Sequence, residues 1–161
     1  MKAKTWIYEA ARWLAAIAVV VYLVVLFGGN TVSSAAFSDV CAAVMDVVDT
    51  DNMQEAENRM IKRLYGLDPG SFEGCSLYYP VTNMDAEEVL ILKLSDTSQQ
   101  EAVADAVQQR LQTQRNTFEG YGVEQFDLLT NHYVLQVQGN FVLFAVGEFS
   151  GDAVAAFRDA L

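Results

Sequence analysis

The longest apolar stretch of the chain lies near its N-terminus. Residues Trp13–Ala36 carry no charged side chain, and ten of the fifteen residues in Trp13–Phe27 are Leu, Ile, Val or Phe. A helix over residues 13–32 would be roughly 30 Å long, which matches the hydrocarbon thickness of a bilayer. The pattern predicts a transmembrane signal anchor over residues 13–32, after a cytoplasmic n-region over residues 1–12.

The same stretch also fits a cleaved secretion signal, because the small residues at 33–35 and 34–36 resemble cleavage sites. Basic residues precede the apolar run and are expected to remain in the cytoplasm. They are Lys2, Lys4 and Arg12. Both interpretations place residues 37–161 outside the cytoplasm, after a short linker at residues 33–36. The uncleaved form is predicted to be a single-pass protein of the cell membrane, with its N-terminus cytoplasmic and its C-terminal domain outside.

Apolar residues then recur at helical spacing, which predicts two helices in succession. The first covers residues 37–48. The second covers residues 51–64, with Asp51 as its N-cap and Gly66 as its C-terminal stop.

Further along, the pattern changes to period two and predicts four strands. They lie at residues 75–81, 87–94, 132–138 and 141–147. Pro80 cannot donate a backbone hydrogen bond, so the first strand is expected at an edge or to end near that residue. Gly139-Asn140 separates the last two strands and predicts a two-residue hairpin turn.

Helical spacing returns between and after these strand pairs. Ser98 and Glu101 match a capping box, and the helix they open carries an apolar line as far as Phe118. A short helical turn is expected over residues 124–129, and Ser150 is expected to cap a final short helix. The order of elements after the span is therefore α, α, β, β, α, β, β, α.

Helices and strands do not alternate one to one, which argues against a doubly wound parallel sheet. The predicted fold class is α+β: a single N-terminal transmembrane helix, then an antiparallel sheet of about four strands with helices on one face. In residues 89–94 the leucines point one way, and Val89, Ile91 and Lys93 point the other, so neither face is plainly polar. The second face is expected to be covered by the two N-terminal helices or by a partner.

Composition and charge exclude several classes of function. The 161 residues carry 10 basic and 21 acidic side chains, a net charge of −11. Residues 37–161 alone hold 7 basic and 20 acidic side chains, a formal charge of −13. Such a domain is not expected to bind nucleic acid, which needs a basic face. One His and two Cys exclude multi-His metal sites, Cys-rich zinc modules and disulfide scaffolds, so no metal or cofactor is expected.

Candidate catalytic groups are sparse. Glu87 and Glu88 are adjacent on a predicted strand and point to opposite faces, so they cannot act as one acid–base pair. The chain has no G-x-S-x-G elbow, Walker loop or G-x-G-x-x-G motif. A hydrolase would need a cleft that gathers groups such as Glu119, Asp127 and His132.

The two cysteines, Cys41 and Cys75, would both lie outside the cytoplasm, where thiols can oxidise. A disulfide between them would close a loop of about 35 residues and join the first helix to the first strand. The alternative is two buried free thiols that pack as small apolar residues.

A set of aromatic residues flanks predicted loops and is a candidate ligand or partner surface. Its members are Tyr65, Tyr79, Phe118, Tyr121 and Phe126. The alternative is packing at the edge of the core, which is the more common fate of such side chains.

Several short sequences together resemble one family. They are Tyr65–Leu67, the block at residues 84–93, Arg110, Gln114, residues 118–125 and residues 139–146. The chain resembles, over about residues 37–161, a Gram-positive bacterial family, the domain of unknown function numbered four-three-five-eight. The resemblance implies an exported protein held by a lipid or one span, with an extracytoplasmic α+β domain and no known catalytic residues. The family pattern has Pro where Val123 stands, so the turn there is expected to differ.

These observations favour a non-catalytic, membrane-tethered extracytoplasmic domain that binds another envelope protein or a cell-wall ligand. The alternatives are an unrecognised cell-wall hydrolase and a structural subunit of a membrane machine.

Overall fold

The computed structural model describes residues 32–161, which fold into five helices, five strands and two short 3₁₀ turns. The helices are α2 (Phe37–Met45), α3 (Asn58–Tyr65), α4 (Gln100–Phe118), α5 (Val123–Asn131) and α6 (Ser150–Asp159). The strands are β1 (Met53–Glu55), β2 (Phe72–Pro80), β3 (Glu88–Leu94), β4 (Tyr133–Gln138) and β5 (Phe141–Val146). The 3₁₀ turns are η1 (Pro69–Ser71) and η2 (Thr97–Gln99).

The predicted fold class needs correction in two respects. The sheet has five strands instead of about four. Within residues 32–161, moreover, no helix is long and apolar enough to cross a membrane. The expected n-region and nearly all of the expected span at residues 13–32 lie outside the described residues.

All neighbouring strands are antiparallel, in the order β1-β2-β3-β5-β4. The unexpected strand is β1, which pairs with the end of β2 and occupies the start of the predicted second helix. Its flanks hold it there, because the Val81 amide donates to the Asn52 carbonyl (2.9 Å) and the Ala56 amide to the Leu77 carbonyl (2.8 Å). These backbone bonds to β2 outweigh the helical spacing of the apolar residues. Helix α3 therefore begins only at Asn58, although Gly66 ends it in the left-handed conformation as predicted (φ 69°).

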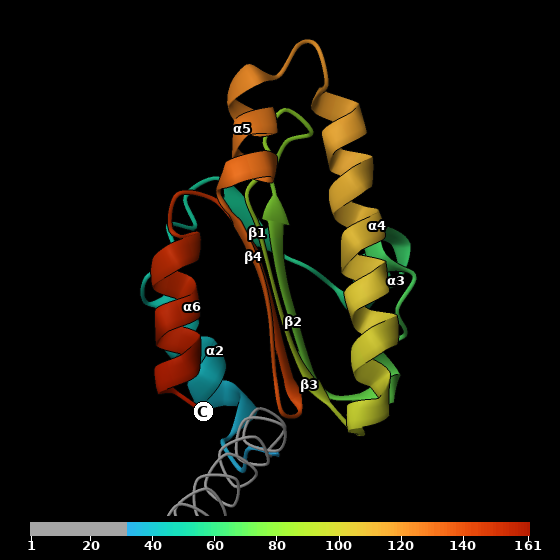
Figure 1. The fold of residues 1–161 in the computed structure, drawn as a ribbon, viewed down its shortest axis with the longest axis vertical. Coiled ribbons are helices and arrows are strands. Elements are labelled where there is room, and N and C mark those ends of the chain that lie inside the picture. The colour runs from blue at the N-terminus through green and yellow to red at the C-terminus, as the bar shows by residue number, and fades with distance from the viewer. Residues whose placement is uncertain (1–31) are drawn as a thin grey trace, which may run out of the picture. The chain divides into compact units, whose positions relative to one another are not determined.

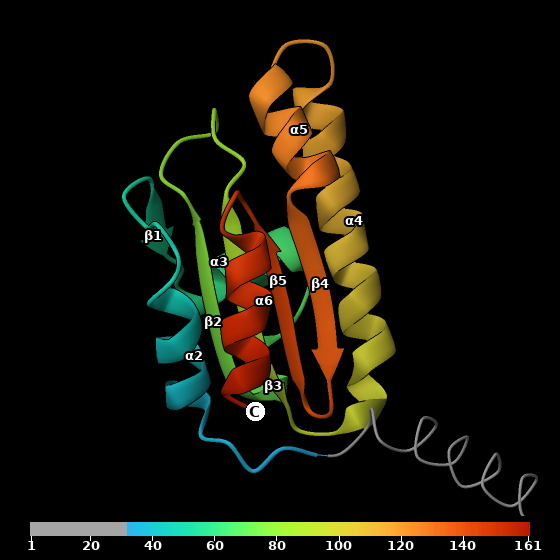
Figure 2. The same ribbon diagram turned by 60° about the vertical axis from the view of Figure 1, so that its left-hand side comes forward.

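Helices cover both faces of the sheet, which makes three layers (Figure 1). Helices α2 and α6 pack on one face, and α3, α4 and α5 pack on the other (Figure 2). The expectation of helices on one face was therefore wrong. The two N-terminal helices also do not share a face, since α2 and α3 lie on opposite sides of the sheet.

The strand alternation accounts for the two cores. Leu90, Leu92 and Leu94 of β3 point toward α3 and α4, together with Phe144 of β5. The odd-numbered side chains of the same strands point toward α2 and α6, where Phe157 of α6 is fully buried. A strand with apolar residues on both faces is typical of a sheet that is buried on both sides.

The predicted hairpin turn is confirmed between β4 and β5. Gly139 has a φ of 58°, and the turn brings Gln138 opposite Phe141. The side chain of Asn140 holds the predicted linker, because its Oδ1 accepts a hydrogen bond from the Ser33 amide (2.8 Å). Lys93 Nζ in turn donates to the carbonyl of Ala35 (3.2 Å). Residues 33–36 are therefore docked on the α2–α6 side of the sheet.

The entry to α4 differs from the prediction by two residues. The capping box is formed by Asp96 and Gln99, not by Ser98 and Glu101, and it begins the 3₁₀ turn η2 that leads into α4. Asp96 Oδ1 accepts from the Ser98 amide (2.8 Å), and Gln99 Oε1 accepts from the Asp96 amide (3.2 Å). Aspartate and serine both serve as N-caps, so the spacing alone allowed either choice.

Candidate functional site

A charged group is buried beneath α3 and α4. Glu88, the first residue of β3, has 1% of its surface exposed. Its Oε2 accepts hydrogen bonds from Arg110 Nη2 (2.7 Å) and Arg110 Nε (3.2 Å), and its Oε1 accepts one from the Tyr65 hydroxyl. Both carboxylate oxygens therefore have hydrogen-bond partners. A charged group that is buried in a protein needs such partners. We call these three residues the buried triad.

The sequence positions the triad by ordinary periodicity. Glu88 is in phase with Leu90, Leu92 and Leu94, so the pleat turns it toward α4. Arg110 lies three residues after Val107 on the buried side of α4. Tyr65 is the last residue of α3.

The electrostatics keep Tyr65 protonated and Arg110 charged. Burial raises the pKa of Tyr65 well above its ordinary value, and the adjacent Glu88 charge raises it further. The phenol therefore remains a donor to the carboxylate. Burial alone would lower the pKa of Arg110, but the Glu88 charge outweighs it and the net shift is upward. Arg110 is a fixed cation.

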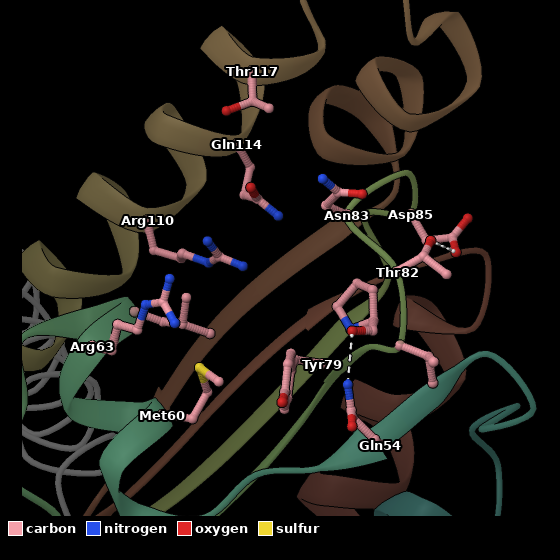
Figure 3. A pocket seen from close by; sticks show the side chains of 13 residues that line it. Gln54, Met60, Arg63, Tyr79, Thr82, Asn83, Asp85, Arg110, Gln114 and Thr117 are labelled. Carbon is pink, nitrogen blue, oxygen red and sulfur yellow. Dashed lines mark hydrogen bonds between the residues drawn. The ribbon is translucent and has the colours of Figure 1, made fainter.

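Arg110 also lines an open cleft of about 320 Å³ between α3, α4 and the β2–β3 loop (Figure 3). Arg63 of α3 and Gln114 of α4 lie beside it, and Asn83 of the loop lies opposite. Tyr79 and Met60 form much of the remaining wall. A second hollow of about 370 Å³ adjoins the cleft and shares Arg63 and Tyr79 with it.

Several hydrogen-bonding groups in the cleft are not used inside the protein. The contacts of Arg110 with Glu88 use Nε and Nη2 and leave Nη1. Within residues 32–161 the side chains of Arg63, Gln114 and Asn83 form no hydrogen bond or ion pair. The cleft therefore presents a fixed cation, a second guanidinium and two side-chain amides to whatever enters it.

The structure does not bring the five predicted surface aromatics together. Tyr79 lines the cleft, whereas Tyr65 and Phe118 are buried, at 6% and 2% exposure. Tyr121 and Phe126 lie near the turn between α4 and α5 and are exposed. Phe118 and Tyr121 do touch, with ring centroids 6.0 Å apart.

The three residues considered for a hydrolase are only partly gathered. His132 Nε2 lies 3.6 Å from Asp127, and His132 Nδ1 lies 3.1 Å from Glu148. Glu119, directly after the end of α4, makes no ion pair with His132. Neither His132 nor Asp127 lines the cleft.

Cys41 of α2 and Cys75 of β2 are free thiols, and both residues line one shallow hollow. Cys41 packs against the core under α2 and α6, whereas Cys75 packs against the core under α3 and α4. Burial raises the pKa of Cys41 to about 11, with a smaller effect from Glu55. Burial and the nearby Cys41 raise the pKa of Cys75 to about 12. Within the described residues, no cluster of three or more His, Cys, Asp or Glu is placed to hold a metal ion.

Sequence reasoning missed the buried triad and Arg63. The available sign was Glu88, because an acid in phase with the inward leucines of a buried strand requires a partner. Arg110 on the inward side of the following long helix was the residue able to supply it.

The fold and the cleft define a three-layer α+β domain with an open cleft on one face of its sheet, whose wall carries Arg63, Arg110 and Asp85. The chain belongs to the family described as a domain of unknown function, DUF4358, which matches residues 46–147. The resemblance read from the sequence is thereby confirmed. The matched residues contain all five strands and helices α3 to α5, whereas α2 and α6 lie outside them. No curated protein and no solved structure matches the chain.

Proposed function

We propose that this chain is a non-catalytic binding domain that acts outside the cytoplasm, and that its ligand occupies the cleft between α3, α4 and the β2–β3 loop. The observation that carries the proposal is Arg110, which Glu88 and Tyr65 fix in place while it faces an open cleft. A donor held by other side chains needs no reorganisation when a ligand arrives, which favours binding.

The energetic argument supports the same site. Replacing a buried ion pair by apolar residues of similar volume is often neutral or stabilising. The Glu88–Arg110 pair therefore needs a reason beyond stability. Holding a guanidinium at the wall of a cleft is such a reason, and Arg63, Gln114 and Asn83 provide further groups around it.

Binding is favoured over hydrolysis by the chemistry of the cleft wall. Its charged side chains are Arg63, Arg110 and Asp85, and the Asp85 carboxylate accepts a hydrogen bond from the Thr82 hydroxyl (2.8 Å). The pair of Asp127 and His132 lies elsewhere. No observation favours the hydrolase alternative.

The location is proposed from the sequence. An uncharged stretch from residue 13 to residue 36, preceded by basic residues, is typical of an exported chain. In intact cells stripped of their wall, added protease should degrade residues 37–161. Full protection of that domain would contradict an extracytoplasmic location.

The binding role can be tested in intact cells with a photo-crosslinking amino acid at one position of the full chain. At position 114, inside the cleft, we expect covalent adducts with a wall fragment or an envelope protein. Position 108 is the matched control, because Gln108 is exposed on the same helix and does not line the cleft. Equal adducts at both positions, or none at position 114, would contradict the proposal.

A further inference from the structure

We infer that the cleft recognises a peptide-like ligand through a free carboxylate group, which Arg63 and Arg110 bind together. The inference rests on the proposed function of the cleft and names the chemistry of its ligand.

The first support is the distribution of charge. Residues 37–161 hold only 7 basic side chains against 20 acidic ones. Three of the seven lie on the eight-residue helix α3, and Arg110 lies beside that helix on α4. They are Arg59, Lys62 and Arg63. Arg63 and Arg110 line the cleft beside a single acidic residue there, Asp85. The cleft wall is therefore less acidic than the domain as a whole, which favours an anionic group there over other parts of the surface.

The second support is the geometry of the two guanidinium groups. Figure 3 shows Arg63 and Arg110 next to each other, on neighbouring helices, both facing the cleft. Arg110 is held by Glu88 through Nε and Nη2 and lines the cleft, and Arg63 forms no hydrogen bond or ion pair within the described residues. Guanidinium groups form their strongest hydrogen bonds with carboxylate or phosphate oxygens.

The third support separates carboxylate from phosphate. Phosphate sites typically use consecutive backbone amides of a glycine-rich loop or a helix N-terminus. The cleft is instead lined by the sides of α3 and α4 and by the loop at residues 81–85, which contains no glycine.

The remaining groups match a peptide. Gln114 and Asn83 each carry an amide that can donate and accept, as a peptide group requires. Gln54, also on the wall, already uses its amide in this way when it donates to the Pro80 carbonyl (3.4 Å). Tyr79 and Met60 offer an apolar surface to a small side chain.

Isothermal titration calorimetry of the full chain, purified in mild detergent, tests the inference with three probes. They are N-acetyl-dialanine with a free C-terminal carboxylate, the same peptide as its C-terminal amide, and inorganic phosphate. We expect the free acid to bind and the amide to bind about tenfold more weakly or worse, because charge-assisted hydrogen bonds are lost. Phosphate should not displace the acid.

Two substitutions tie the result to the site. Arg63→Gln should weaken binding of the acid by about tenfold or more. Lys62→Gln is the matched control, since it removes the same charge from the same helix at a position that does not line the cleft. Both residues are exposed, so neither variant is expected to unfold the domain.

The outcomes separate this inference from the proposed function. Failure of the acid to bind, equal binding of acid and amide, tighter binding of phosphate, or no effect of Arg63→Gln would each overturn the carboxylate assignment. In those cases, adducts formed at position 114 but not at position 108 would still support the cleft as a binding site. Loss of those adducts would overturn both.

Discussion

The two faces of the sheet are both covered by helices, but they bury different kinds of side chain. Beneath α2 and α6 the core is apolar, and its one amine, on Lys93, lies at the edge near Glu73 (3.3 Å). Beneath α3 and α4, Glu88 and Arg110 are enclosed with Tyr65 and adjoin an open cleft. The first face is explained by stability alone. The second contains a buried ion pair beside an open cleft, and we propose that this pair serves binding as well as folding.

The sharpest difference between the faces is the cost of breaking the buried triad. Replacing Arg110 by Met should destabilise the protein by about 3–5 kcal/mol, because Glu88 would remain buried without its cation. Urea denaturation of the full chain measures this. Arg158→Met, at an exposed residue of α6, is the control and should change stability by less than about 0.5 kcal/mol.

A double substitution distinguishes the effect of an unpaired buried charge from the effect of lost side-chain packing. Adding Glu88→Leu to Arg110→Met removes both charges and should restore part of the lost stability, although the Tyr65 hydroxyl then loses its acceptor. If the double variant is as unstable as the single one, the ion pair is not the cause of the loss.

The disulfide between Cys41 and Cys75 remains a prediction, and it would join two residues that pack against opposite cores of the sheet. Oxidation would release two protons and two electrons to an external oxidant, and the bridge would stabilise the domain by roughly 3–4 kcal/mol through loop closure. Mass spectrometry after alkylation, on protein prepared without reductant, decides between the two states. Two alkylated cysteines would exclude the bridge.

The turn between β4 and β5 affects both cores, because the two strands that it connects place side chains on both faces of the sheet. Gly139→Val should cost about 1 kcal/mol or more, because a β-branched residue resists a φ of 58°. Gly151→Ala is the control, as its added Cβ meets nothing within 4 Å and its φ is not positive. An unchanged melting temperature for Gly139→Val would contradict the turn.

The smallest effect, absent at neutral pH, is a loss of stability in alkali. Cys41 and Cys75 have pKa values of about 11 and 12 in the fold against 9.0 when unperturbed. Between about pH 9 and 12 the unfolded chain therefore binds fewer protons, and stability falls as pH rises. The raised pKa of Tyr65 acts in the same direction above pH 10.0.

Removing both thiols tests their contribution to this loss of stability. In the double variant Cys41→Ala and Cys75→Ala, stability should fall less steeply between pH 9 and 11 than in the wild type. Identical pH profiles would contradict the raised thiol pKa values.

The sequence predicted elements well where one local rule decided the outcome. The alternation at residues 87–94 and the Gly139-Asn140 turn are examples, and both are present with small shifts in their ends. The sequence predicted the wrong element where pairing with a distant segment decided the structure. Residues 53–55 fit a helical stripe, but pairing with Tyr78–Pro80 makes them a strand.

The candidate site depended on distant partners even more. Cys41 and Cys75 do line one hollow, as their placement on a helix and a strand allowed. The five aromatic residues were predicted to form a surface because they lie near predicted loops. Position near a loop does not determine burial, and Tyr65 and Phe118 are buried. The cleft needs α3, α4 and the β2–β3 loop to meet, which no local pattern specifies.

The central claim is that ligands bind on the α3–α4 face and not on the α2–α6 face. Hydrogen–deuterium exchange of the full chain, with and without soluble muropeptides from digested cell walls, tests it directly. We expect slower exchange in α3, in the part of α4 around Arg110 and in residues 81–85, with α2 and α6 unchanged. Protection confined to α2 and α6 would contradict it.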